Sequence, residues 1–406
     1  MKIVRCSMGL TSSLVGLDHS LAEAGESFGK DLGFLRRHTE VVVLSGESGQ
    51  AQVAVAPQWQ GRVMTSTAGG LDGTSFGWVN RQLIESRQVQ PHINVFGGED
   101  RFWLGPEGGQ FSLFFSKGAS FDLDHWFTPA SLDTEPFQVL SQTAQSVVCG
   151  RSIQLANHSG TRFTLDVNRE VRLLQSVRAL GSLGVSVPSG LKAVAFESVN
   201  TVKNTGPVPW QKDSGLVSLW ILGMFNASPD TTIVLPFEKG DEAVRGPVVN
   251  DAYFGKVPAD RLIVGDGVVF FRGDAAFRSK IGLPPRRAKS LMGSYDANSR
   301  TLTLVHFTLP AGAVDYVNSM WEIQKNPFGG DVSNSYNDGA PKPGAKGLGR
   351  FFELESSSPA LALQPGASAT HVHQTFHLQG SEAQLDAIAR VALGTGLEQI
   401  KHAFKK

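Results

Sequence analysis

At 406 residues, the chain is long enough for one large β domain or two ordinary ones, and its 45 glycines and 20 prolines favour many turns over long helices. The 37 basic and 37 acidic side chains cancel, which removes the electrostatic reason to expect nucleic acid or an anionic membrane as a partner. Two cysteines, Cys6 and Cys149, are too few for a disulfide scaffold, and their spacing matches no metal motif.

The chain begins MKIVRCSMGLTSSLVGL, where serine, threonine and glycine interrupt the apolar residues before a signal-peptide core forms. No stretch reaches the roughly 18 apolar residues that a membrane helix needs. We therefore expect a soluble protein, periplasmic or cytoplasmic, with no membrane insertion and no implied protein partner. Residues 1–38 are predicted to form an N-terminal extension that is partly helical within SFGKDLGFLRRH.

From residue 39, the chain has the rhythm of short strands separated by turns. In TRFTLDV, Phe163, Leu165 and Val167 fall on one face, and polar residues lie between them. Similar runs lie near residues 40, 51, 110, 193, 231 and 300, each bounded by Gly, Pro, Asn or Asp. The pattern predicts an all-β sandwich or barrel. Without a repeat or a linker, one domain over residues 39–380 is the simplest organisation.

A helix is predicted near the C-terminus. Ser381 and Gln384 form a capping-box pattern ahead of Leu385 and Ile388, which recur at helical spacing. Residues 381–406 are therefore expected to form a helical segment packed on the sandwich.

A glycine-rich segment, INVFGGEDRFWLGPEGGQF, is predicted to be too irregular for a strand and is typical of a functional loop. It carries Arg101, Trp103 and Glu107, and it contains no phosphate-binding motif. Trp103 would either stack on a sugar ring or fill the core. The segment that follows contributes His125, a candidate acid or base, although a lone histidine is more often structural.

Polar residues also gather between positions 316 and 349. In DYVNSMWEIQ, alternation predicts a strand whose polar face is either a binding floor or a solvent-exposed side. The glycines and prolines of residues 329–349 predict a long loop without regular structure. Its polar groups suit sugar hydroxyls or a Ca²⁺ ion, but they are also ordinary turn residues: Asp331, Asn334, Tyr336, Asn337 and Asp338.

The segment RFFELESSSPA is predicted to be a strand with two carboxylates on one face. Glu353 and Glu355 would lie about 7 Å apart on that face, with Phe352 and Leu354 on the other. In a cleft, burial and mutual repulsion would raise the pKa of at least one carboxyl and prepare a general acid or base. A solvated strand face is the alternative.

Three histidines share one face of the last predicted strand, ATHVHQTFHLQG. His371 and His373 lie two residues apart and His377 follows, a spacing that could hold zinc. The outer face of a terminal strand is the alternative, and no metal ligand is assigned.

Four segments together give the chain a family resemblance: GGEDRFWLGPEGGQFSLFF, WFTPASLDTEPF, GGDVSNSYNDG and FFELESSSPALALQPGASATHVHQTFHLQG. They resemble an uncharacterised bacterial family of the galactose-mutarotase-like superfamily over roughly residues 90–380, with a remote resemblance to aldose 1-epimerases. The resemblance implies an all-β galactose-mutarotase-like β-supersandwich with a few peripheral helices. It also implies that Glu355, in an L-E-S match to the epimerase L-E-T or L-E-P motif, is the catalytic glutamate. The H-P-Y-F-N-like motif that supplies the epimerase histidine is absent.

We therefore expect a carbohydrate-active enzyme that uses acid–base chemistry, either epimerase-like or glycoside-cleaving, and that needs no cofactor. The catalytic candidates are Glu355, His125 and Glu107. The residues expected to bind the sugar are Trp103, Arg101, Asp331, Asn334, Tyr336, Asn337 and Asp338. The alternatives are a non-catalytic glycan-binding protein and a polysaccharide lyase that uses Tyr336 and Arg101.

Overall fold

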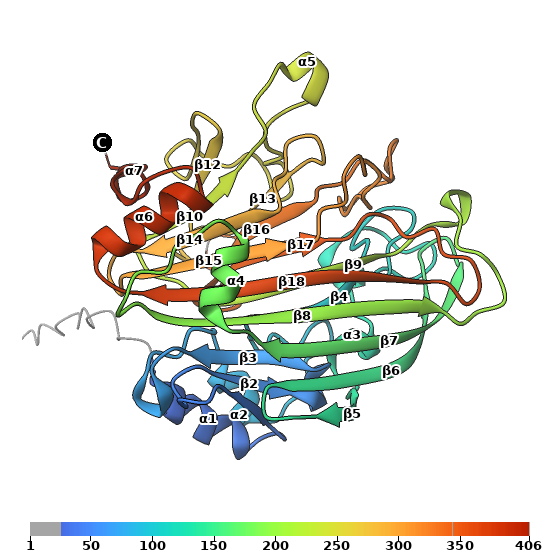
Figure 1. The fold of residues 1–406 in the computed structure, drawn as a ribbon. Helices are drawn as coiled ribbons and strands as arrows, with labels where there is room; N and C mark the ends of the chain where they lie inside the picture. The colour runs from blue at the N-terminus through green and yellow to red at the C-terminus, as the bar shows by residue number, and fades with distance from the viewer. Residues whose placement is uncertain (1–25, 343, 406) are drawn as a thin grey trace, which may run out of the picture.

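The computed structural model describes residues 26–342 and 344–405, and the chain is mostly β, as predicted (Figure 1). Cys6 and most of the predicted N-terminal extension lie outside the described residues. The smallest sheet has three antiparallel strands: β1 (Val42–Ser45), β2 (Gln52–Ala56) and β3 (Arg62–Thr67).

The largest sheet has ten strands, and every neighbouring pair is antiparallel. In spatial order they are β11 (Leu262–Val264), β12 (Val268–Arg272), β10 (Thr231–Pro236), β14 (Leu291–Asp296), β15 (Thr301–Phe307), β18 (Ser368–Gln379), β8 (Lys192–Asn204), β7 (Arg162–Leu173), β6 (Ser146–Ala156) and β5 (Gln138–Gln142).

The third sheet has five antiparallel strands and lies behind the ten-stranded sheet in Figure 1. In spatial order they are β13 (Ser279–Leu283), β16 (Ser333–Asn337), β17 (Phe351–Ser357), β9 (Ser218–Asn226) and β4 (Arg101–Gly105).

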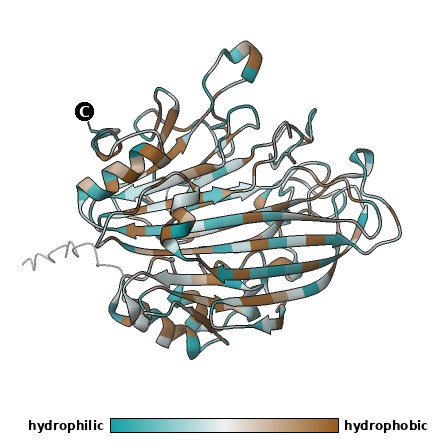
Figure 2. Ribbon diagram, viewed as in Figure 1, coloured by the Kyte–Doolittle hydropathy of each residue, from teal (hydrophilic) through white to brown (hydrophobic). Residues whose placement is uncertain are grey.

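Alternating side chains build the core between these two sheets. On β7, Phe163, Leu165 and Val167 are buried as predicted, and Figure 2 shows hydrophilic and hydrophobic residues alternating along the strands around it. One hydrophobic cluster joins Ile233 of β10 in the ten-stranded sheet to Leu354 of β17 in the five-stranded sheet. The two sheets therefore pack face to face as a sandwich.

The helices are short and peripheral. They are α1 (Phe28–Arg36), α2 (Arg81–Ser86), α3 (Ala130–Asp133), α4 (Ser176–Ser182), α5 (Glu242–Arg245), α6 (Glu382–Ala392) and α7 (Leu397–His402), with 3₁₀ turns η1 (Pro57–Trp59), η2 (Gly70–Asp72), η3 (Leu123–His125) and η4 (Lys212–Ser214). None of the helices in the described ranges combines the length and apolarity needed to cross a membrane.

The predicted C-terminal helix is confirmed as α6. The Ser381 hydroxyl accepts a hydrogen bond from the Gln384 N–H, and the Gln384 side chain accepts one from the Ser381 N–H, so the capping box forms. Leu385 and Ile388 are buried in a cluster with residues of β15 and β18. The helix therefore covers the face of the ten-stranded sheet that is turned away from the five-stranded sheet (Figure 1).

Four expectations about local structure are wrong. The glycine-rich segment contains the strand β4, and residues 329–349 contain the strand β16, because each is hydrogen-bonded to a neighbour in the five-stranded sheet. Conversely, the runs near residue 110 and over residues 315–324 form no strand. Phe114 and Phe115 are buried from an irregular segment, so their apolar character reflects the core and not a sheet.

The three histidines of β18 are buried and do not face solvent, because they lie on the face of the ten-stranded sheet that packs on the five-stranded sheet. The rings of His371 and His373 both contact the Ser356 hydroxyl at 2.8 Å, and His377 pairs with Glu99. Burial lowers the pKa of His371 to about 3 and that of His373 to about 4, so both rings are neutral. Within the described ranges, no group of three or more His, Cys, Asp or Glu residues is arranged to hold a metal.

Candidate functional site

One face of the five-stranded sheet carries a cluster of charged side chains. On β17, Glu353 and Glu355 point to this face, while Leu354 points to the core between the sheets, as the alternation predicts. Across the strand pair, Glu355 is in register with Asn334 and Glu353 with Tyr336. The sheet therefore brings together residues that lie in separate segments of the sequence.

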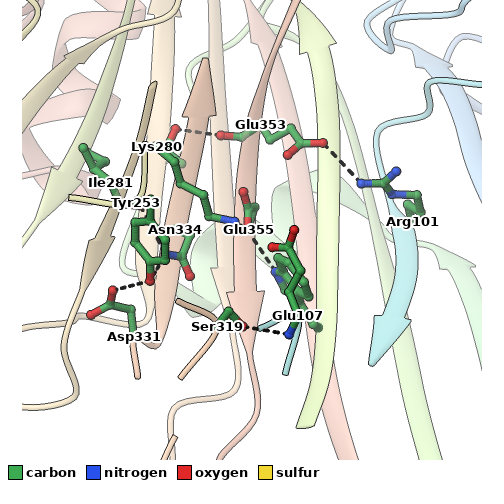
Figure 3. Close-up of polar contacts among 12 residues, drawn as sticks. Arg101, Glu107, Tyr253, Lys280, Ile281, Ser319, Asp331, Asn334, Glu353 and Glu355 are labelled. Carbon is green, nitrogen blue, oxygen red and sulfur yellow. Dashed lines mark hydrogen bonds and ion pairs between the residues drawn. The ribbon is translucent and has the colours of Figure 1, made fainter. Parts of the chain in front are cut away.

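A buried ion pair lies at the centre of the cluster. The Lys280 ammonium on β13 donates a hydrogen bond to Glu355 Oε2 at 3.0 Å, and the Trp220 indole N–H on β9 donates to the same oxygen at 2.9 Å (Figure 3). Glu355 is fully buried. Burial disfavours the charge of Lys280, but Glu355, Glu107 and Glu353 together outweigh it and raise the pKa of Lys280. Lys280 is therefore held as the cation.

The second acid of β17 has its own cation. The Arg101 guanidinium on β4 lies 3.4 Å from Glu353, and both side chains are buried. Burial, together with the neighbouring Glu355 charge, raises the pKa of Glu353 to about 8 in spite of Arg101. The Glu353 carboxyl is therefore easier to protonate than that of an exposed glutamate.

Glu107 enters the cluster from the segment after β4, as Figure 3 shows. Its backbone N–H donates to the Ser319 hydroxyl at 3.1 Å, which fixes this segment against residues 315–324. Burial raises the pKa of Glu107; Lys280 opposes that shift and Glu355 adds to it, which places the Glu107 carboxyl beside the central pair. Of the three predicted catalytic residues, the structure thus brings Glu107 and Glu355 together in this cluster.

Asp331 forms the opposite wall of the cluster. Its carboxylate accepts hydrogen bonds from the Tyr253 hydroxyl at 2.6 Å and from the Asn250 amide at 3.1 Å, while the Asn334 amide donates to the Tyr253 oxygen at 3.1 Å. Burial raises the pKa of Asp331 to about 6, although the two hydrogen bonds and Lys280 oppose the shift. Asp331 can therefore exchange a proton near neutral pH.

These side chains enclose a small pocket on the open side of the ion pair. Its empty volume, which includes space open to solvent, is about 300 Å³. The lining combines charged, hydroxyl, amide and aromatic groups: Gly105, Ser218, Trp220, Tyr253, Lys280, Val317, Ser319, Asp331, Asn334 and Ser357. Such a lining can hydrogen-bond several hydroxyl groups of one small polar ligand.

Two predicted residues lie away from this pocket. His125 is on η3, its side chain is about half exposed at 51%, and its ring pairs with Asp122 at 2.6 Å. His125 therefore lies on a half-exposed surface turn, away from the cluster in which it was expected. Trp103 is buried, donates its indole N–H to the Leu132 carbonyl and packs against Trp220 at 5.4 Å. Of the two roles considered, Trp103 fills the core, because its ring packs among Phe114, Trp126 and Trp220.

Three further predicted residues support the walls and do not line the pocket. Tyr336 donates its hydroxyl to Asp338, which also accepts the Gly349 N–H and so ties down the segment after β16. Asn337 points to the other face and accepts the Ala275 N–H. Asp331 and Asp338 thus have separate partners at opposite ends of β16, and a Ca²⁺ ion bound by this segment stays a prediction.

The sequence interpretation missed Lys280, Trp220 and Tyr253. A lone lysine in the apolar strand SKIGL was a usable signal, because a lysine is rarely buried without a carboxylate partner. Trp220 was hidden within the apolar run of β9. Tyr253 lies in a segment without regular structure, so no periodicity marked it.

Comparisons with known proteins identify the fold. A family model described as a family of unknown function matches residues 26–404, and no curated protein matches the chain in sequence. A candidate aldose 1-epimerase from Escherichia coli K12 is similar in structure, with 13% identity, 84% of this chain and 99% of that chain covered, and a TM-score of 0.51. The Slr1438 protein from Synechocystis sp. PCC 6803 is similar at 12% identity, with 84% and 96% covered and a TM-score of 0.51. At these identities the likeness shows the fold alone, and it confirms the predicted galactose-mutarotase-like β-supersandwich.

Proposed function

Because the chain belongs to this family of unknown function, DUF6786, its activity has to be inferred from its site, and we propose that it is an enzyme that acts on a sugar by acid–base chemistry in the pocket. The fold it shares with a candidate aldose 1-epimerase supports a carbohydrate-related role. Fold alone does not determine function, so the argument rests on the pocket.

The observation that carries the proposal is that two groups of opposite charge, Asp331 and Lys280, line one pocket. With a pKa of about 6, Asp331 is mostly ionised at pH 7 and can accept a proton. Lys280 is kept protonated by the carboxylates around it and can donate one. A base and an acid facing one small ligand are what the interconversion of sugar anomers requires.

In the proposed reaction, Asp331 takes the proton of the anomeric hydroxyl while the bond between the anomeric carbon and the ring oxygen breaks. The ring oxygen takes a proton from Lys280. Rotation of the resulting aldehyde and the reverse transfers then close the ring as the other anomer, which returns both protons. Asn334 and the hydroxyls of Ser218, Ser319 and Ser357 would hold the remaining hydroxyl groups.

Glu355, which the resemblance marks as the catalytic glutamate, has a different role in this proposal. It is fully buried beneath Lys280, and its hydrogen bonds come from Lys280 and Trp220. We assign it the role of a positioning residue that keeps Lys280 charged and aimed at the pocket. Glu107 lies beside the same pair and adds to the negative field that holds the ammonium.

A non-catalytic glycan-binding protein is the second candidate, because the serine hydroxyls and the Asn334 amide of the pocket can bind a sugar without transferring protons. Cleavage of a glycoside has less support, because it needs two carboxyl groups at the substrate, and Asp331 lines the pocket whereas Glu107 and Glu355 lie behind its lining. The lyase alternative has less support, since Tyr336 and Arg101 do not line the pocket and each is engaged, with Asp338 and with Glu353.

The proposal is tested with purified protein and a panel of monosaccharides and disaccharides, following binding by saturation-transfer NMR and turnover by the anomeric proton signals. The matched variants are Asp331→Asn and Asp315→Asn, a surface carboxylate whose side chain is 48% exposed. We expect turnover that Asp331→Asn reduces about 100-fold or more and Asp315→Asn leaves unchanged. Binding without turnover would make the protein a glycan-binding protein, and neither binding nor turnover would overturn the proposal.

A further inference from the structure

A second pair of side chains lies next to the pocket on the same side of the sheet. Arg278 is two residues before Lys280 of β13, about 7 Å further along in an extended chain. Strand alternation places Arg278 on the same face as Lys280, and Arg278, like Lys280, lowers the pKa of Glu107. Phe254 directly follows Tyr253, which lines the pocket.

These two residues are already in contact. The Arg278 guanidinium lies 3.8 Å from the centre of the Phe254 ring, a cation–π arrangement. The Phe254 and Tyr336 rings also meet in a T-shaped arrangement with their centroids 6.0 Å apart, so Tyr336 supports the Phe254 ring. Phe254 nevertheless remains 38% exposed. Stacking fixes the guanidinium in advance, which lowers the entropy that a ligand would lose on binding to it.

Arg101 and Arg278 differ in their partners. Arg101 is buried against Glu353, whereas no carboxylate among the described residues forms an ion pair with Arg278. The guanidinium approaches the Tyr336 hydroxyl, and its remaining N–H groups can contact further accepting oxygens. An exposed aromatic ring beside a row of donors suits a sugar, whose ring has an apolar face and hydroxyl groups at its edge.

We propose that Arg278 and Phe254 form a second sugar subsite, so that the substrate is an oligosaccharide whose terminal unit enters the pocket. This deepens the proposed function and rests on it. The roughly 300 Å³ of empty space in the pocket includes space that is open to solvent, so the pocket itself is small and a longer sugar must extend out of it. A second ring must then lie outside, and in the direction of Arg278 it meets the exposed ring of Phe254.

The test compares D-galactose and D-glucose with lactose, cellobiose and maltose, measuring dissociation constants by titration calorimetry and anomeric exchange by NMR. The variant is Phe254→Ala, and the matched control is Phe277→Ala, which removes a similarly exposed ring, 43% exposed, that also lies near an arginine, Arg261. Arg278→Gln tests the second member of the pair.

At least one disaccharide is expected to bind about 10-fold more tightly than its terminal monosaccharide. Phe254→Ala and Arg278→Gln should each remove about 3- to 10-fold of that gain and leave monosaccharide binding unchanged, while Phe277→Ala should change neither. If monosaccharides are turned over but no disaccharide binds more tightly than they do, the subsite alone is overturned. The same holds if a disaccharide binds more tightly and both variants keep that tighter binding. A gain that depends on Phe254 without any turnover overturns the catalytic proposal and keeps the subsite, and no binding of any sugar overturns both.

Discussion

The Lys280 ammonium lies 3.0 Å from Glu355 Oε2 beneath the pocket, and the two residues come from strands that are separated by β16. Their side chains bridge over β16 on one face of the sheet (Figure 3). The pair places a positive charge in the lining of the pocket, which Asp331 also lines. The properties of this pair and of its surroundings lead to four predictions.

The first prediction concerns the stability of the pair. Lys280→Met or Glu355→Gln leaves one buried charge without its partner and should each lower the free energy of unfolding by about 3–5 kcal/mol. The double variant should be more stable than the sum of the two losses predicts, because no unpaired charge remains. Urea denaturation of the four proteins measures this coupling. Strictly additive losses would show that the ion pair is not formed in solution.

The second prediction is a pH dependence of turnover. Asp331 accepts a proton only when it is ionised, so the rate should rise with pH through the pKa of about 6 and then level off. Asp331→Asn should lower the rate about 100-fold or more and remove this rise. Rates measured from pH 4.5 to 8 decide the point. A rise near pH 6 that persists in Asp331→Asn would assign it to another group.

The third prediction concerns the buried histidines and acid stability. His373 has its pKa lowered from about 6.5 to about 4 by burial, so the unfolded chain binds a proton at a higher pH than the folded protein does. Its contribution to stability is fully present above pH 6.5 and is lost as the pH falls toward 4. His373→Gln should therefore flatten the pH dependence of unfolding over this window by up to about 1.4 kcal/mol per pH unit.

Urea denaturation at pH 7 and at pH 4.5 tests that difference. The free energy of unfolding should fall less between the two values in His373→Gln than in the wild-type protein. An equal fall in both would mean that His373 is already protonated, or is not buried, in the folded protein.

The fourth prediction uses Gly282 of β13. A Cβ atom at this position would lie 2.1 Å from Asp331 Oδ2 and 2.5 Å from Asn334 Nδ2, closer than atoms can approach. Gly282→Ala should therefore displace both side chains and reduce turnover about 10-fold or more. The control is Gly181→Ala in α4, where a Cβ would meet no atom within 4 Å. Turnover unchanged in Gly282→Ala would contradict the assigned pocket.

Local signals explain why much of the fold could be predicted from the sequence. The alternation of β7 and the capping box of α6 depend on residues a few positions apart, and both are confirmed. The strands β4 and β16 could not be recognised, because their glycine, asparagine and aspartate neighbours are typical of turns. They are strands because β9 and β17 hydrogen-bond to them, and strand propensity depends on such tertiary partners.

The site could be predicted only where its residues are close in sequence. The alternation in FFELES places Glu353 and Glu355 on one face, whereas the pairing of Glu355 with Lys280 depends on the order β13-β16-β17 within the sheet. Tyr253 reaches Asp331 from a segment that has no regular structure. Sequence spacing carries no information about such contacts. For the same reason, the sequence could not show that His125 lies away from the site.

The most direct test of the central claim is the rate of exchange between the α and β anomers of D-galactose and D-glucose, measured by two-dimensional exchange NMR at pH 7. Wild-type protein is compared with Lys280→Met and with Lys212→Met, which removes a lysine with a 55% exposed side chain on the surface. We predict exchange that Lys280→Met reduces about 100-fold or more and Lys212→Met leaves unchanged. Exchange that is equally fast in Lys280→Met, or absent from the wild-type protein, would contradict the account of this pocket as an acid–base site.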